Sequence, residues 1–239
     1  MDGKHIAIIC PKKAGSTYFN YKQFHSIVIL ALVSATYKFL IVDIGAQGKH
    51  SDGGIFRHSV MGQRFYNNNM YLPAPSAISA RHQVPYVIVA DEAFQLNLFT
   101  MRPYPSKNLT FSQRIFNYRL SRARLVSEST FGIWVGRWRI LQRPLNTSLE
   151  TSDAIIKATV CLHNLLMSTS YYCRNDYGDK LSDQIINEEW RLRSINNSSN
   201  SCSNNYSKHA GEIRNTFMDY FMNEGKVPWQ EDSIQKNLL

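Results

Sequence analysis

Cysteine and long apolar segments are scarce in this sequence. Its 239 residues include four cysteines, which are too few and too scattered for the disulfide framework of a small secreted domain. The longest apolar run covers residues 27–33, and Lys38 follows soon after it. A membrane-spanning helix needs about 20 apolar residues, and no secretory signal pattern opens the sequence. We therefore expect a protein of a reducing intracellular compartment without a membrane span.

Acidic residues are also scarce, and one stretch almost lacks them. Lys and Arg number 27 against 18 Asp and Glu, which gives a net charge of +9. Residues 93–149 contain nine basic residues, eight of them arginine, and a single acid, Glu128. Because an exposed helix normally mixes both signs, this stretch favours a polyanionic partner such as a nucleic acid. An acidic membrane face is the weaker alternative, since no separate basic amphipathic helix is present.

The apolar residues suffice for one sizeable core, and they fall into runs that predict strands and helices. β-Branched runs predict strands, and Ser51, Thr110 and Thr147 are candidate helix caps. The predicted strands cover residues 5–10, 27–33, 37–43 and 84–90. The predicted helices cover residues 110–143, a segment from 147 onward, and 210–223. Strands followed by long helices indicate a mixed α/β domain.

The composition changes after residue 167. Residues 195–207 consist mostly of Asn and Ser and offer little to bury, so we expect a disordered loop there. The sequence thus predicts a main domain at residues 1–167. A C-terminal extension follows at residues 168–239 and contains the terminal helix.

Three acidic residues form a candidate metal site. Asp2 lies just before the first predicted strand, Asp91 ends the strand at 84–90, and Glu128 lies on the long helix. Carboxylate oxygens suit Mg²⁺ and Mn²⁺, and strand ends plus a helix are a rigid way to bring distant carboxylates together. Each acid has a simpler alternative: Asp2 as an unfixed terminal residue, Asp91 as a turn cap, and Glu128 as an i,i+4 partner of Arg124.

Aromatic and histidine side chains near these acids have two interpretations each. Phe111, Phe116, Tyr118, Trp134 and Trp138 interleave with the arginines. They either stack on bases or form the core face of the helix, and the core is the favoured interpretation. For Cys161 and His163, a zinc site has weak support without a second ligand pair, so a buried structural role is expected.

Several blocks resemble the DDE endonuclease domain of PIF/Harbinger transposases and of the domesticated nucleases derived from them. The blocks are Asp2-Gly3-Lys4-His5-Ile6, Asn20-Tyr21-Lys22, residues 48–56, Asp91-Glu92-Ala93-Phe94-Gln95-Leu96, residues 116–124 leading to Glu128, and Cys161-Leu162-His163-Asn164-Leu165-Leu166. Together they extend over about residues 2–167. The resemblance implies an RNase H-like mixed sheet flanked by helices.

The resemblance also implies an activity and a set of site residues. Asp2, Asp91 and Glu128 would be the catalytic, metal-binding triad of a two-metal DNA endonuclease that uses Mg²⁺ or Mn²⁺. Asp52 would have a supporting role, or it would only cap a helix. The arginine-rich segment itself suggests four residues that would lie near the DNA backbone or support the helix: Arg119, Arg122, Arg124 and Arg137. A separate Myb-like DNA-binding protein is an expected partner, and the nucleus is the expected location, with the cytoplasm as an additional one.

The sequence departs from the family pattern at two places. Only Met1 precedes Asp2, where the family has apolar residues and an upstream helical region, so a truncated first strand is expected. Ser129 follows the third carboxylate, where family members often have asparagine. These departures favour an alternative function, a catalytically inactive, truncated or domesticated module that binds DNA or protein.

Overall fold

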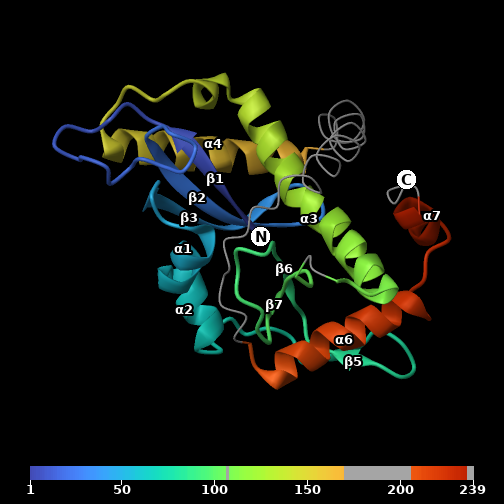
Figure 1. Ribbon diagram of the computed structural model, residues 1–239. Coiled ribbons are helices and arrows are strands. Elements are labelled where there is room, and N and C mark those ends of the chain that lie inside the picture. The colour runs from blue at the N-terminus through green and yellow to red at the C-terminus, as the bar shows by residue number, and fades with distance from the viewer. Residues whose placement is uncertain (106–107, 170–205, 236–239) are drawn as a thin grey trace. The chain divides into compact units, whose positions relative to one another are not determined.

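The computed structural model describes residues 1–105, 108–169 and 206–235 (Figure 1). These residues form two compact units. The first unit contains residues 1–63 and 125–169, and the second contains the described parts of 64–124 and 206–235. The division after residue 167 that the family resemblance implies stays a prediction. Most of the expected loop at 195–207 lies outside the described residues.

A three-stranded antiparallel sheet forms the centre of the first unit. Its strands are β1 (Asp2–Ala7), β2 (Ser26–Val33) and β3 (Phe39–Gln47), in the order β1-β2-β3. The strands predicted at 27–33 and 37–43 are confirmed as β2 and β3, which form an antiparallel hairpin. Ser34 N–H donates to the Lys38 carbonyl at 2.8 Å across its turn. β1 begins at Asp2 rather than near His5, because Asp2 and Gly3 already pair with Ala31 and Leu30.

Two long helices cover one face of this sheet. α4 (Leu149–Ser168) runs behind the strands in Figure 1, and α3 (Phe111–Arg137) contributes its residues from Leu125 onward. Alternate residues of a strand point to the same face, so Ile6 and Ile29 enter a common core with Trp134 and Ile156. All four side chains are almost fully buried. This apolar core fixes α3 and α4 against the sheet.

Two polar residues of α4 bind the main chain at the beginning of β3. His163 is fully buried, and its Nε2 donates to the carbonyl of Tyr37 at 2.8 Å. The Asn164 side chain accepts from Phe39 N–H at 2.9 Å and donates to the Phe39 carbonyl at 2.8 Å. Cys161 is exposed. The expected buried structural role is confirmed for His163 and is wrong for Cys161, whose position on α4 faces away from the core. Burial lowers the pKa of the His163 imidazole.

Short helices follow β3. Ser51 is the N-cap of α1 (Asp52–His58), as predicted, and it accepts a hydrogen bond from Gly54 N–H at 3.3 Å. α2 (Val60–Tyr66) comes next. The cap of α4 is Ser148 rather than Thr147, since Ser148 accepts from Thr151 N–H. The 3₁₀ helix η1 (Arg139–Gln142) follows α3, whose predicted range of 110–143 was too long.

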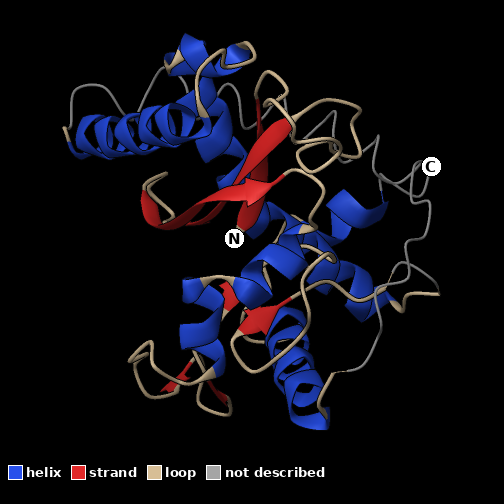
Figure 2. Cartoon of the chain, turned by 90° about the vertical axis from the view of Figure 1, so that its left-hand side faces the viewer, coloured by secondary structure: helices blue, strands red, loops and turns tan. Residues whose placement is uncertain are grey.

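The second unit has much shorter strands (Figure 2). They are β4 (Ser76–Ala77), β5 (Gln83–Val84), β6 (Ile88–Val89) and β7 (Thr100–Met101). The single strand predicted at 84–90 was wrong: β5 pairs with β4, and β6 pairs with β7 in a separate sheet. Pro85 lies between β5 and β6 and has no N–H for a strand ladder. Thr110 and Gln113 form the predicted reciprocal capping box of α3.

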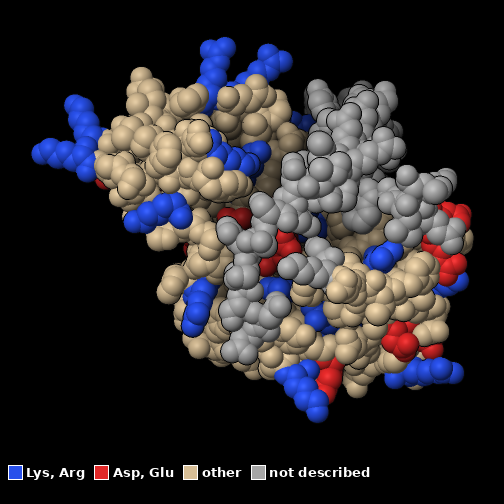
Figure 3. Space-filling view, viewed as in Figure 1, with Lys and Arg blue, Asp and Glu red and all other residues tan. Residues whose placement is uncertain are grey.

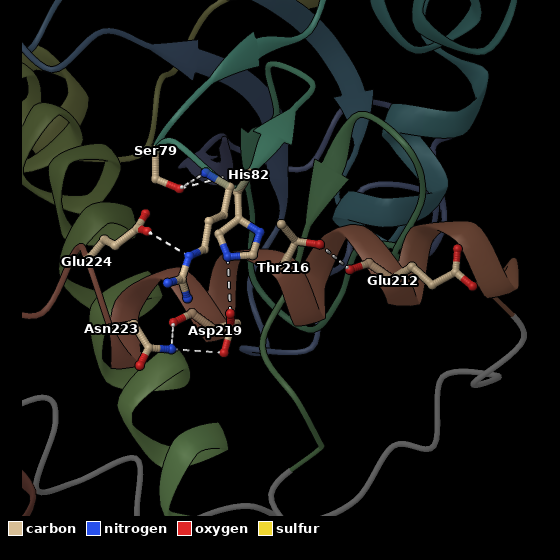
Figure 4. Close-up of polar contacts among 8 residues, drawn as sticks. Ser79, His82, Glu212, Thr216, Asp219, Asn223 and Glu224 are labelled. Atoms are coloured by element: carbon tan, nitrogen blue, oxygen red, sulfur yellow. Dashed lines mark hydrogen bonds and ion pairs between the residues drawn. The ribbon is translucent and has the colours of Figure 1, made fainter.

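Two C-terminal helices complete the second unit. The predicted helix at 210–223 is confirmed as α6 (Lys208–Met222), and α7 (Gln230–Gln235) follows it. His82, beside β5, contacts Asp219 of α6 at 3.1 Å, and Asn223 donates to the same carboxylate (Figure 4). Arg81 lies 3.9 Å from Glu224. Side-chain polar contacts thus attach α6 to the β4–β5 hairpin. In the described part of the chain, no helix has the length and hydropathy of a membrane span.

Candidate carboxylate site

Asp2 and Glu128 lie at the same end of the sheet in the first unit. The Asp2 side chain lies on the same face of the sheet as Ile6, because residues four apart in a strand share a face. Residues of α3 pack on this face. Glu128 lies one helical turn before Phe131, which packs on that face. The Met1 ammonium donates to Ser127 Oγ at 3.4 Å. The residues directly before Asp2 and Glu128 are therefore in contact.

Asp52 lies beside this end of β1. Its carboxylate occupies the space that a side chain at position 3 would need, so that a Cβ on Gly3 would clash with it. Gly3 N–H donates to Asp2 Oδ1 at 2.9 Å, which fixes the orientation of the Asp2 carboxylate. Asp52 is also the first residue of α1, one position after its cap. The Asp-Gly pair thus lets a second acidic side chain approach the strand end, and the supporting role of Asp52 stays a prediction.

Asp91 belongs to the second unit and lies two residues after the end of β6. Ala90 N–H donates to the Met101 carbonyl at 3.0 Å, and Asp91 begins the turn that follows. Its Oδ1 accepts from Ala93 N–H at 2.9 Å, which is the capping contact considered above. Asp91 is half-buried. Two members of the predicted triad, Asp2 and Glu128, thus belong to the first unit and Asp91 belongs to the second, and the meeting of all three stays a prediction.

Arg102 fixes the turn that carries Asp91. Only 7% of this residue is exposed, and its Nη1 donates to the carbonyls of Phe94 at 3.2 Å and Glu92 at 3.4 Å. Arg102 is one of the nine basic residues at 93–149, the stretch whose charge favours a polyanionic partner. Its buried guanidinium instead binds the main chain on both sides of Ala93. This is a positioning role that the sequence did not reveal.

The carboxylates fit a hard divalent cation by their chemistry. Mg²⁺ prefers oxygen ligands and is usually held by one or two carboxylates, with water and substrate phosphates completing the shell. Asp2 and Glu128 supply two such groups on one rigid unit. Among the described residues, no three His, Cys, Asp or Glu side chains are grouped closely enough to form a complete metal cage.

A comparison with protein families shows to which family the chain belongs. A family model described as DDE superfamily endonuclease matches residues 1–164. This chain belongs to the DDE superfamily endonucleases. No curated protein and no solved structure matches it. The match includes Asp2, Asp91 and Glu128, and the mixed α/β architecture is consistent with a fold of this family.

Two of the arginines expected at DNA contact the C-terminal helices of this DDE-family chain. Arg119 Nη1 donates to Gln230 Oε1 at 3.0 Å and to the Gly225 carbonyl at 3.1 Å. Its guanidinium lies 4.6 Å from the ring centroid of Phe221, and burial lowers the pKa of Arg119. Arg122 lies 4.6 Å from the ring centroid of Trp229. These contacts attach residues 221–230 to α3, and a role at the DNA backbone stays a prediction for both arginines.

The other arginines and the aromatic residues of α3 differ in exposure. Arg124 is buried, with 8% of its surface exposed, and Arg137 is half-buried near His163, whose pKa it helps to lower. A role at the DNA backbone stays a prediction for them as well. Among the five aromatic residues considered for base stacking, the core interpretation is confirmed for Phe116, Tyr118 and Trp134, which are buried. Phe111, by contrast, is 43% exposed.

Proposed function

We propose that this DDE-family protein is a metal-dependent endonuclease of transposase descent that hydrolyses phosphodiester bonds in DNA. The observation that carries the proposal is the position of Asp2 and Glu128 at one sheet end, within the region that matches the endonuclease family. The block resemblance favours the PIF/Harbinger type. A nuclear location and a Myb-like partner belong to the same proposal, since a DNA substrate and a target-recognising subunit are needed.

Asp2, Asp91 and Glu128 would hold Mg²⁺ or Mn²⁺ through their oxygens. Bound divalent ions would activate the attacking water and stabilise the leaving oxygen of the phosphodiester. The chain itself contributes orientation. Gly3 N–H fixes the Asp2 carboxylate, Ala93 N–H fixes that of Asp91, and Arg102 fixes the turn around Asp91. Small displacements of such groups cost large factors in rate, so these main-chain bonds matter for activity.

The decisive experiment compares Asp91→Asn with Glu92→Gln in the full chain. Wild type with Mn²⁺ should nick labelled DNA, and Asp91→Asn should lose cleavage to background because one metal ligand loses its charge. Glu92 is the exposed neighbouring acid, so Glu92→Gln should cleave like wild type. Circular dichroism should show that both variants fold.

Two other results would contradict the proposal. Cleavage by Asp91→Asn at the wild-type rate would remove Asp91 from the site. DNA binding by wild type without any cleavage, with or without divalent metal, would favour the alternative of an inactive DNA-binding module.

A further inference from the structure

A second region without acidic residues surrounds the β1–β2 connection. Between Asp2 and Asp43 the sequence contains five lysines and no Asp or Glu. Three of those lysines, Lys12, Lys13 and Lys22, are exposed on the loop that joins the two strands. On the face drawn in Figure 3, Lys and Arg atoms project from the left edge, where Figure 1 places this loop, and few acidic atoms are visible there. The loop thus offers a local positive surface.

One turn of this loop is held rigidly by a buried asparagine. Asn20 is 3% exposed, and its Oδ1 accepts from Lys22 N–H at 2.9 Å and Phe24 N–H at 3.3 Å. Its Nδ2 donates to Ser26 Oγ at 2.9 Å. Ser26 Oγ also contacts His5 Nδ1 at 2.8 Å. The turn at residues 20–25 is therefore fixed to the first residue of β2 and to the middle of β1.

The residues presented by this turn are an aromatic ring and a lysine. Tyr21 is 79% exposed, yet its ring is positioned by the edge-to-face contact with His5, at 5.6 Å between centroids. Lys22 Nζ lies 5.5 Å from the Tyr21 ring centroid. Single exposed aromatic residues are common on proteins. This one differs because buried hydrogen bonds hold its backbone and a lysine accompanies it.

The local field around the turn is positive. Burial, followed by the charges of Lys22 and Lys4, lowers the pKa of His5 to about 4. A neutral His5 is therefore in place at physiological pH beneath Tyr21, and Lys22 is the lysine of the turn that supplies positive charge. Such a surface attracts a polyanion.

We propose that the turn at residues 20–25 is a DNA-binding element, in which Lys22 contacts a backbone phosphate and Tyr21 stacks on an unpaired base. An exposed aromatic face next to a basic side chain is the arrangement that binds single-stranded nucleic acid. His5, beneath the turn, lies on β1, the strand that begins with Asp2. Because Tyr21 would stack on an unpaired base, the turn would bind DNA that has an unpaired stretch. The inference rests on the proposed function, since it concerns the same substrate.

The test measures DNA binding by fluorescence anisotropy, with the full chain in EDTA so that no cleavage occurs. One probe is a blunt duplex, and the other is the same duplex with a single-stranded extension. Tyr21→Ala should weaken binding of the extended duplex about 5-fold or more, which is the lower end for loss of one base–aromatic stack. The blunt duplex should lose less. Tyr21→Phe retains the ring and should bind like wild type.

Lys22→Ala should weaken binding of both probes and reduce the slope of log K against log salt by about 0.7–0.9, as expected for one lost phosphate contact. Matched controls are Lys157→Ala, which removes an exposed lysine of α4, and Tyr71→Ala, which removes a tyrosine that is 94% exposed. Both controls should bind like wild type.

Three outcomes would overturn the inference. If Tyr21→Ala and Lys22→Ala bind like the controls, the turn is not a DNA-binding element, and the nuclease proposal is unaffected. If Tyr21→Ala weakens both probes equally, stacking on an unpaired base is wrong. If wild type binds neither probe, the inference and the proposed DNA substrate fail together.

Discussion

The two units of this protein are stabilised by different kinds of contact. In the first unit, strands of six to nine residues pair in one sheet, and an aliphatic and aromatic core packs the helices on it. In the second unit each strand has two residues. There, arginine contacts help hold the helices. Long strands can be predicted from apolar runs in the sequence. The arginine contacts of the second unit follow no periodic pattern and cannot be predicted in this way.

Arg214 illustrates the second type of order. It is 3% exposed, its guanidinium lies 3.9 Å from the ring centroid of Tyr104, and Nη1 donates to the Pro103 carbonyl at 3.4 Å. Burial raises the pKa of Tyr104, although the charge of Arg214 opposes the shift. Arginine tolerates such burial because its weakly hydrated, planar group stacks on rings. The basic residues of this unit therefore contribute to packing as well as to charge.

The largest expected effect is on the core of the first unit. Trp134→Ala should destabilise the protein by about 3–5 kcal/mol, because a fully buried aromatic residue leaves a cavity that the core fills only partly. Urea unfolding followed by circular dichroism measures the change. Trp229→Ala, at an exposed tryptophan of the second unit, is the matched control and should cost much less. Equal losses for the two variants would contradict the contrast between the units.

A smaller effect is expected where Arg119 holds the C-terminal helices. Arg119→Lys keeps the charge but loses the planar group that contacts Phe221, Gly225 and Gln230. We expect a loss of about 1 kcal/mol, the scale of a hydrogen bond, and faster amide hydrogen exchange in α7. Arg81→Lys, at an arginine whose side chain is 82% exposed, should leave exchange in α7 unchanged. Unchanged exchange in both variants would mean that apolar contacts alone hold α7.

The smallest effect is a pH dependence from His5. The folded-state pKa is about 4, below the value of about 6.5 in the unfolded chain. The unfolded chain therefore binds the proton first as pH falls. Stability that is fully present above pH 6.5 should be lost progressively toward pH 4. His5→Gln should unfold in urea with a weaker dependence on pH across this window. The same change at exposed His50 should not reproduce that weakening.

Sequence reasoning succeeded where a pattern repeats along the chain. The apolar runs predicted β2 and β3, helical spacing predicted α6, and Ser51 was identified as a cap. It failed at residues 84–90, where the apolar run concealed the interruption at Pro85. For the candidate site, the family blocks directed attention to Asp2 and Glu128, which the first unit places at one sheet end. Their meeting with Asp91 is a tertiary question that spacing cannot answer.

The residues whose roles the sequence did not predict make the same kind of hydrogen bond. Asn20, Arg102 and Asn164 each use a polar side chain to bind main-chain groups. Such bonds have no complementary residue type elsewhere in the sequence, because every residue has a carbonyl and almost every residue has an N–H. Only their presence in the family blocks could have marked them. Asn20 and Asn164 lie in blocks quoted for the resemblance, and Arg102 lies six residues after the block that ends at Leu96.

The hydrogen bond between His163 of α4 and the main chain before β3 also limits which residues can be replaced during evolution. His163 binds the carbonyl of Tyr37, which adopts a left-handed backbone conformation with φ 60°. Any residue offers that carbonyl, and Gly or Asn would adopt the conformation more easily than tyrosine does. The residue type at position 37 can therefore change during evolution without loss of this hydrogen bond, whereas the residue type at position 163 cannot. This hydrogen bond thus depends on the residue type at position 163 alone, whereas the ring of Phe39 in β3 adds a contact with His163 at 5.2 Å between centroids.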